Sequence, residues 1–294
     1  MASLKEIKVR IGSVKSTRKI TSAMKMIASS KLHKAQSAIL NFLPYQRKLD
    51  SILTNLLSSD TTSDSPFTKK REVKRVGIVI FSSNSTLCGA FNSNMKKELL
   101  QIYHSKLHLG KENIEVYPVG KKIEQFVDKE LSFKMGSFQD IANQPVFSDV
   151  QALSATLMEK YMKAELDEIT LIYHHFKSTG TQVLTTSTFL PFDLSQSQAD
   201  KGENKALGGN ADYILEPNKE EILKSLIPTV LNSKLFAAAL DSTASEHAAR
   251  LMAMQVATDN ADDLIQNLTV QYNKTRQQAV TNELLDIIGG ASAL

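Results

Sequence analysis

The sequence predicts a mixed α/β fold: a long antiparallel two-helix coiled coil, made of an N-terminal and a C-terminal helix, with a small central Rossmann-like α/β domain. Apolar residues recur every three to four positions over residues 4–57 and again over residues 219–288, which is the period of a helix. Between them, short apolar runs alternate with helical patterns, as in a small α/β domain. At 1.5 Å per residue the two terminal helices would reach about 80 and about 105 Å, too long for one globular core.

The composition fits a folded chain with buried cores. The chain has 294 residues, of which 42% are hydrophobic, with one Cys and no Trp. This apolar fraction excludes disorder of the whole chain, and a single Cys excludes a disulfide framework and a Cys-rich zinc site. The longest apolar run, Val76–Phe81, is too short to span a membrane. The start of the chain has no apolar signal core, so we expect a soluble protein without a targeting segment.

Charge is distributed unevenly along the chain. Residues 1–50 hold eleven Lys and Arg against two acidic residues, a charge of +9, although the whole chain carries only +4. The remaining residues therefore sum to −5, and residues 219–294 contribute −3 of that charge. Opposite charge on the two terminal helices favours their pairing.

The first helical pattern is not a regular coiled-coil repeat. A six-residue step from Val14 to Ile20 breaks the heptad, so the apolar stripe wanders around the helix. Pro44 predicts a kink or a local break, because proline removes a backbone donor. Two paired helices cannot bury a wandering stripe of this length, so we expect apolar surface to remain for other chains.

The C-terminal helix has signals at both ends. Asn218 can cap it, with Glu221 three residues later as in a capping box, and Gly289–Gly290 is expected to end it. Small residues at helical spacing should let the partner helix come close. They are Ala244, Ala248, Ala257 and Ala261.

The central part of the chain alternates between strands and helices. The expected strands cover residues 74–81, 114–119, 168–176 and 182–189, the last two joined as a hairpin around residues 178–180. The expected helices cover residues 95–107, 121–131 and 149–166. We therefore divide the chain into an N-terminal coiled-coil helix (1–57), a central α/β domain (73–192), a mobile polar linker (193–212) and a C-terminal coiled-coil helix (213–294).

The loop Ser82–Asn92 occupies the place where a nucleotide-binding fold would cradle phosphate. It contains neither G-x-G-x-x-G nor G-x-x-x-x-G-K-[ST], so a packed turn is the favoured interpretation over nucleotide binding. Cys88, within the loop, has no nearby His in the sequence to activate it, which favours a small buried residue over a nucleophile.

Two further groups could suggest metal binding. His174 and His175 are adjacent on an expected strand, so their side chains should point to opposite faces and not share a metal. Asp259, Asp262 and Asp263 share a helix face, where a solvated or Lys-facing acidic surface is favoured over a metal site. We expect no metal and no cofactor.

These observations indicate an elongated, non-catalytic protein that binds partners. A nucleic-acid-binding coiled coil remains an alternative because the first helix is basic, although no aromatic residues that could stack on bases accompany it. An enzyme that uses the α/β domain is a second alternative.

Two segments carry a closer resemblance. Residues 7–28, with Lys31-Leu32 and Ala35-Gln36, are similar to the N-terminal signature of the gamma subunit of F-type ATP synthases. The C-terminal part resembles the same family over residues 245–254, 257–261, 272–277, 281–284 and 287–291. The resemblance implies a central rotor shaft that contacts the alpha and beta subunits of F1, the epsilon subunit and the c-ring of Fo. It implies ATP chemistry in beta, proton or sodium flow as the drive, and no nucleic acid or small-molecule substrate for this chain.

The same resemblance implies contact residues on both helices. Met24 and Lys25 match a stretch that faces an acidic loop of beta in the family, and Ile287–Leu294 matches an end held in a smooth apolar collar. Positions that match contacts to alpha and beta loops are Arg250, Gln277, Thr281 and Glu283. For each residue, packing within the coiled coil is the alternative.

The chain departs from the family in the loop after the first central strand. Asn84, Ser85, Thr86 and Ala90 stand where the family usually has Asp, Arg, Gly and Gly, so a partner contact through this loop is in doubt. Cys88 alone cannot form the internal disulfide of the chloroplast branch. Without a transit segment, we expect a bacterial chain, peripheral to the cytoplasmic face of the inner membrane.

Overall fold

The fold is described from a computed structural model of the chain. It describes residues 3–58, 66–68, 71–131, 134–192, 216 and 218–292. The chain forms two compact units, Met1–Ser29 with Arg250–Leu294 as the first and Ser30–Ala249 as the second. The expected linker 193–212 lies outside the described residues, and so does most of the polar stretch 58–66.

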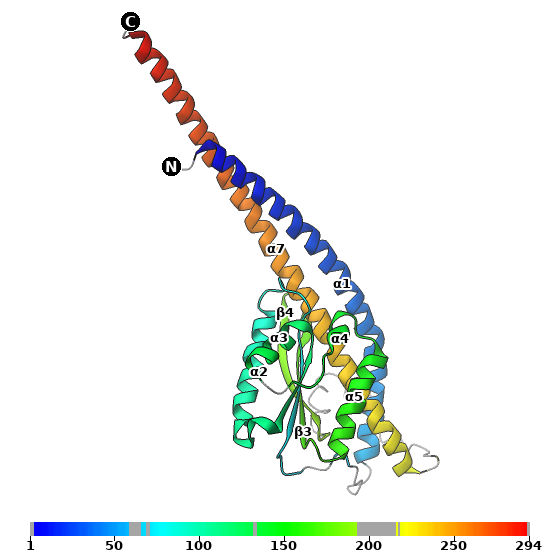
Figure 1. The fold of residues 1–294 in the computed structure, drawn as a ribbon. Helices are drawn as coiled ribbons and strands as arrows, with labels where there is room; N and C mark the ends of the chain where they lie inside the picture. Colours follow the sequence, from blue (N-terminus) through cyan, green and yellow to red (C-terminus); the bar gives the residue numbers. More distant parts are fainter. Residues whose placement is uncertain are drawn as a thin grey trace. The chain divides into compact units, whose positions relative to one another are not determined.

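Two long helices form the ends of the chain, α1 (Leu4–Ser58) and α7 (Lys219–Ser292) (Figure 1). Helix α1 continues through Pro44, so the proline does not break the helix. The Asn218 cap is confirmed, because its Oδ1 accepts a hydrogen bond from the Glu221 backbone N–H at 2.9 Å. The expected stop at Gly289–Gly290 is wrong, since α7 continues to Ser292.

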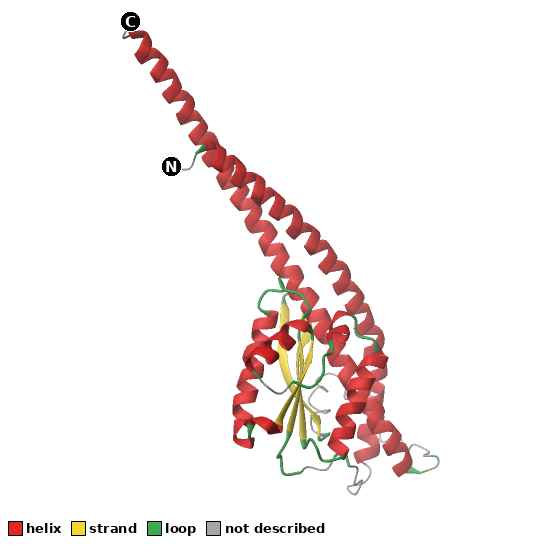
Figure 2. Ribbon diagram, viewed as in Figure 1, coloured by secondary structure: helices red, strands yellow, loops and turns green. Residues whose placement is uncertain are grey.

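The second unit contains a four-stranded sheet in the order β2-β1-β3-β4 (Figure 2). The first three strands are parallel and β4 is antiparallel to β3, joined by the expected hairpin. The strands are β1 (Val76–Phe81), β2 (Ile114–Val119), β3 (Glu168–Ser178) and β4 (Thr181–Leu190). This confirms the predicted α/β alternation, with an antiparallel strand added to one edge.

Helices cover both faces of this sheet (Figure 1). They are α2 (Phe91–Lys106), α3 (Lys121–Glu130), α4 (Gln139–Asn143) and α5 (Phe147–Met162). Two 3₁₀ turns, Leu107–Leu109 and Lys111–Asn113, connect α2 to β2. The sequence pattern misses α4, whose five residues are too few to show a period.

The sheet separates two apolar cores within the second unit. On one face Ile78 packs with Met95 and Leu99 of α2, and all three are fully buried. On the other face Leu171 packs with α5, with the last turns of α1 and with the first part of α7. The continuous apolar pattern of β1 follows from burial on both sides.

A buried carboxylate organises the segment after α3. Glu124 accepts hydrogen bonds from Lys134 Nζ at 3.1 Å, Ser137 Oγ at 2.9 Å and Gln139 Nε2 at 2.8 Å. Burial alone would raise the pKa of Glu124, but the hydrogen bonds from Gln139, Lys134 and Ser137 outweigh burial and lower it. The charged form of Glu124 therefore holds this connection in place.

His174 of β3 is a buried titratable group. Its ring stacks on Phe91 with the ring centroids 4.5 Å apart, and its Nδ1 has no hydrogen-bond partner among the described residues. Burial lowers the pKa of His174 to about 4. The expectation that the two histidines face opposite ways is confirmed, because His175 is exposed while His174 is buried.

This burial predicts a loss of stability at mildly acidic pH. Unfolded His174 has a pKa of about 6.5, so between pH 6.5 and 4 the unfolded state binds a proton that the folded state excludes. The free energy of unfolding should fall by about 2 kcal/mol from pH 7 to pH 5 through this group. The pKa of Glu124 is lowered from its ordinary value of 4.5, so the stability it contributes is lost mainly below pH 5 and changes little between pH 7 and pH 5.

Urea titrations of the full chain at pH 7 and pH 5 measure this effect. His174→Leu should lose that 2 kcal/mol of pH dependence, whereas His33→Gln, a change at an exposed histidine of α1, should keep it. An unchanged pH dependence in His174→Leu would show that another group titrates.

Candidate partner-contact surface

The first unit is a pair of helices that share one narrow seam. The buried residues of the seam are Ile7, Thr21 and Ala28 from α1 and Met254, Thr258, Ala261 and Leu268 from α7. Alanine and threonine are small, so the two backbones can approach closely. Ala261 confirms part of the predicted small-residue stripe; Ala257 is only half-buried.

Two threonines meet at the centre of this seam. The hydroxyls of Thr21 and Thr258 are hydrogen bonded across the pair at 2.9 Å. Each hydroxyl also lies within hydrogen-bonding distance of a carbonyl in its own helix, Arg18 O at 3.0 Å and Met254 O at 2.7 Å. The buried hydroxyls are therefore satisfied, and they fix the antiparallel register.

An ion pair lies beside the threonines. Arg18 Nε pairs with Asp262 Oδ1, and both side chains are 49% exposed. Asp259 accepts from Gln255 Nε2 of its own helix, at 2.8 and 2.9 Å to its two oxygens. The opposite charges of the two helices thus meet in at least one direct contact. The acidic face of α7 is exposed, as expected, but the cation that faces it at Asp262 is an arginine and not the expected lysine.

Apolar side chains line the outer side of both helices. Of the twenty-one exposed large hydrophobic residues within the described part of the chain, fourteen belong to this unit. On α1, Val9, Ile20, Met24 and Ile27 fall within about 60° of one another at about 100° per residue, on a face that adjoins the buried seam at Met24 and turns away from it at the other three. On α7 the exposed set is Met252, Val256, Leu264, Val270, Val280, Leu284, Leu285, Ile287 and Ile288. We call these thirteen residues, together with Met26 of α1 as the fourteenth, the outer apolar surface.

The last part of α7 extends beyond α1. The register of Thr21 with Thr258 places the start of α1 opposite about residue 275. Residues 277–292 therefore project past the partner helix (Figure 1). At 1.5 Å per residue this projecting part is about 24 Å long. Among the side chains of α7 that the structure describes, Leu268 is the last buried one. Leu284 and Ile288 are exposed, so this tip is apolar and uncovered.

The six predicted contact residues all lie in the first unit. Met24 is 37% exposed, and Lys25 and Arg250 are half-buried. Those three lie near one level, because the register places residue 24 opposite about residue 255. Gln277, Thr281 and Glu283 are exposed. They lie about 40 to 50 Å further along α7 than Arg250, so the six form two separate groups.

The predicted packed turn at Ser82–Asn92 is confirmed. Asn92 Nδ2 donates to Ser83 Oγ at 2.7 Å and to Cys88 Sγ at 3.1 Å, and the Ser83 backbone N–H donates to Asn92 Oδ1 at 3.2 Å. Cys88 is buried, as expected. Side chains of the loop therefore occupy its interior.

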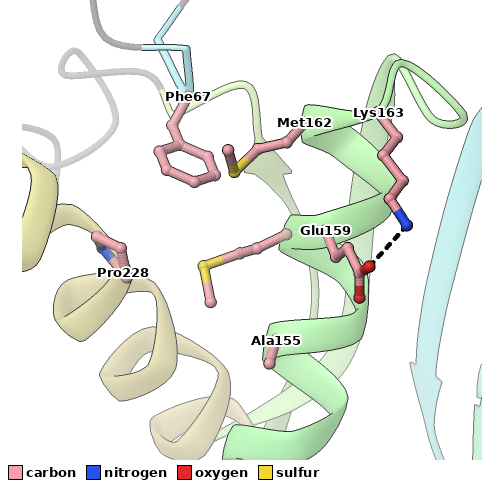
Figure 3. Close-up of a pocket in the computed structure, with 7 residues that line it drawn as sticks. Phe67, Ala155, Glu159, Met162, Lys163 and Pro228 are labelled. Atoms are coloured by element: carbon pink, nitrogen blue, oxygen red, sulfur yellow. Dashed lines mark hydrogen bonds and ion pairs between the residues drawn. The ribbon is translucent and has the colours of Figure 1, made fainter.

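A hollow of about 360 Å³ is lined by Phe67, Ala155, Met158, Glu159, Met162, Lys163 and Pro228 (Figure 3). Its only charged groups are Glu159 and Lys163, which pair with each other at 2.7 Å. Within the described residues, no three His, Cys, Asp or Glu side chains group as metal ligands would.

The comparisons with known proteins agree with the two-helix arrangement. A family model described as ATP synthase matches residues 3–294. The ATP synthase gamma chain of Bacteroides fragilis (strain ATCC 25285) is 59% identical over 293 residues, covering 100% of both chains. The chain belongs to the ATP synthase gamma-chain family. The gamma chain of Christiangramia forsetii is 44% identical, covering 100% of this chain and 99% of its own.

Solved structures share the fold of this gamma-family chain. The central stalk of the Tetrahymena thermophila mitochondrial ATP synthase is 24% identical with a TM-score of 0.61, covering 81% of this chain and 99% of that one. A Euglena gracilis mitochondrial ATP synthase structure is 19% identical with a TM-score of 0.64, covering 99% and 94%. Within the described residues, no helix is both long and apolar enough to span a bilayer.

Sequence reasoning missed the specific contacts that set the register. The sequence shows Arg18 only as part of the basic charge of residues 1–50 and Asp262 only as part of an acidic helix face, although the two residues pair directly. The position of Thr258 on the buried side of α7 could have been predicted, because it follows the buried Met254 by four residues and so lies on the same helix face. No pattern in one helix, however, identifies Thr21 as its partner on the other.

A double-mutant cycle tests the threonine pair. Thr21→Val and Thr258→Val should each lower the free energy of unfolding by about 1 kcal/mol, because each leaves the other hydroxyl with one partner fewer. The double variant should cost about as much as either single one. Urea titration of the full gamma-family chain measures all three. Thr269→Val is the matched control, since its hydroxyl bonds only within its own helix; additive costs for the pair would contradict the interaction.

Proposed function

We propose that this gamma-family chain is the central-stalk rotor subunit of an F-type ATP synthase. It carries rotation of the c-ring, driven by a proton or sodium gradient, to the alpha and beta subunits for ATP synthesis, and works in reverse during hydrolysis. The observation that supports this role best is the outer apolar surface, which a two-helix unit cannot cover by itself.

The physical basis of transmission is differential contact. A helix pair has no rotational symmetry, so its faces present different surfaces to the subunits around it. Ile20, Met24 and Ile27 form an apolar stripe, and basic Lys25 is half-buried beside it. Each catalytic subunit therefore meets a different surface and is biased toward a different nucleotide-binding state.

The chain's parts take separate roles in this proposal. The N-terminal helix (1–57) and the C-terminal helix (213–294) form the shaft, and the α/β domain (73–192) forms a foot on the c-ring beside the epsilon subunit. The chain is non-catalytic and uses no cofactor, because nucleotide and chemistry belong to beta. We place it as a peripheral protein on the cytoplasmic face of the bacterial inner membrane, in keeping with its bacterial relatives.

Recovery of partners is the first test. A tagged chain purified under conditions that preserve the complex should recover alpha and beta subunits in stoichiometric amounts. Recovery of the chain alone would contradict the rotor assignment. ATP hydrolysis by the purified chain alone would instead support an enzyme, and salt-sensitive binding to duplex DNA would support a nucleic-acid-binding protein.

The contact residues are tested by turnover. We expect Arg250→Ala and Gln277→Ala each to lower ATP hydrolysis by the assembled complex roughly tenfold, because each removes a polar group proposed to bond alpha or beta. Alanine variants of Met24, Lys25, Thr281 and Glu283 are tested in the same way, by ATP hydrolysis of the assembled complex.

Gln278→Ala is the matched control for Gln277, since it removes an identical, exposed side chain from the adjacent position. It should leave turnover within twofold of the unaltered complex. Equal turnover in Gln277→Ala and Gln278→Ala would remove Gln277 from the contact set, and circular dichroism of each variant would confirm that the chain stays helical.

A further inference from the structure

Helix α7 is bound to the β3–β4 hairpin by polar contacts as well as by apolar packing. Lys234 Nζ donates to Thr188 O of β4 at 3.0 Å, and Ser245 Oγ donates to His174 O of β3 at 3.1 Å. Lys234 and Ser245 are eleven residues apart, so they lie on nearly the same side of α7 and about 16 Å apart along it. We call these two contacts the hairpin clamp.

The two contacts of the hairpin clamp lie on opposite edges of the hairpin. Thr170 pairs with Thr188, and four residues further along β3 His174 pairs with Leu184 in the same regular ladder. Pairs alternate in type along an antiparallel ladder, so these two pairs are of one type. The carbonyls of Thr188 and His174 accept from α7, so in both pairs the backbone groups point away from the opposite strand. One contact is therefore at the outer edge of β4 and the other at the edge of β3 that faces away from β4.

The side chains beneath α7 agree with this crossing. Leu171 lies on the sheet face that packs against the first part of α7, and alternation along β3 puts His175 on the same face. His175 Nδ1 lies 2.7 Å from Oδ2 of Asp241, which falls between the two clamp residues along α7. Helix α7 therefore runs diagonally over the hairpin, from the outer edge of β4 at Lys234 to the far edge of β3 at Ser245.

Two separated hydrogen bonds fix the direction of α7 across the hairpin. The paired positions of Leu184 and Thr188 are about 13 Å apart along the strands. A single contact would act as a pivot, whereas two contacts at opposite edges oppose turning and sliding. Apolar packing opposes separation but has no preferred direction, while a hydrogen bond weakens steeply when its donor and acceptor become misaligned.

The hairpin is also attached to the helix on its other face. The ring of His174 stacks on Phe91 of α2 with the centroids 4.5 Å apart, and Thr186 Oγ1 donates to Glu98 Oε1 of α2 at 3.0 Å. His174 thus contacts α2 through its ring and α7 through its carbonyl. A displacement of α2 and the sheet is passed to α7 through the hairpin.

We propose that Lys234 and Ser245 are positioning residues that transfer torque between the α/β domain and α7. This inference rests on the proposed rotor function, in which the c-ring turns the α/β domain and the rotation must reach the terminal helices. The hairpin clamp keeps α7 from turning on the hairpin under that load. The exposed His175–Asp241 contact, with a histidine side chain that is 55% exposed, adds less to the clamp.

A double variant, Lys234→Met with Ser245→Ala, tests the clamp in the assembled complex. Lys234→Met removes the donor but keeps the apolar stem, and Ser245→Ala removes a hydroxyl from a buried site. ATP synthesis by membrane vesicles, driven by the ion gradient that drives the unaltered complex, should fall roughly threefold or more. ATP hydrolysis by the F1 sector released from the same membranes should not change, because no torque then enters through the α/β domain.

The matched control is Lys224→Met with Ser233→Ala. Lys224 is an exposed lysine of α7, and Ser233 is a buried serine whose Oγ donates to Thr229 O of its own helix at 2.9 Å. This control should leave both rates unchanged. Lys234→Arg, combined with Ser245→Ala, should restore much of the synthesis that Lys234→Met loses, because the guanidinium keeps a donor for the β4 carbonyl.

The outcomes separate the clamp from the rotor function and from folding. Unchanged synthesis in the double variant would overturn the clamp proposal, and so would an equal loss of synthesis and hydrolysis, which would show a role in folding alone. A control pair that lowers synthesis as much as the double variant would also overturn it. If the unaltered chain recovered no alpha and beta subunits, the rotor function itself would fail and the clamp's role with it.

Discussion

The constraint on which the first unit depends is that two helices share only one seam. Each helix can bury only the side that faces its partner, so Thr21 and Thr258 are covered while Ile20 and Val256 are not. A larger bundle would cover the outer sides with further helices, and this unit has none within the described residues. The single seam that stabilises the helix pair therefore also leaves apolar side chains exposed on the outer sides of both helices.

A seam built from small residues needs polar contacts to define its register. Alanines such as Ala28 and Ala261 allow close approach but differ little from one position to the next, so sliding by one turn would cost little packing. The buried Thr21–Thr258 hydrogen bond and the Arg18–Asp262 ion pair match only in one register. The half-exposed ion pair adds little free energy in water, so its role is specificity more than stability.

Local pattern predicted the elements better than their contacts. Helical periodicity and short apolar runs placed the terminal helices and all four strands within a few residues, because burial imposes those periods on a sequence. The predicted end of the C-terminal helix at Gly289 was wrong, because a helix can continue through a glycine at a cost of about 1 kcal/mol. The pairing of Thr21 with Thr258 is a relation between residues 237 positions apart, which no local period can report. The six contact residues came from resemblance alone, because an exposed glutamine such as Gln277 has no signature in one sequence.

The altered loop after β1 shows why a family's contacts must be transferred one residue at a time. Asn84 Oδ1 accepts from the Lys121 backbone N–H at 2.9 Å, and its Nδ2 donates to Gln139 O at 2.8 Å. An aspartate could make the first bond but not the second, because a carboxylate has no proton to donate. The amide therefore ties the loop to the starts of α3 and α4, a link that the usual family residue cannot make. The order of this loop comes from within the α/β unit, which explains how the chain keeps a packed turn without the family's charge pair.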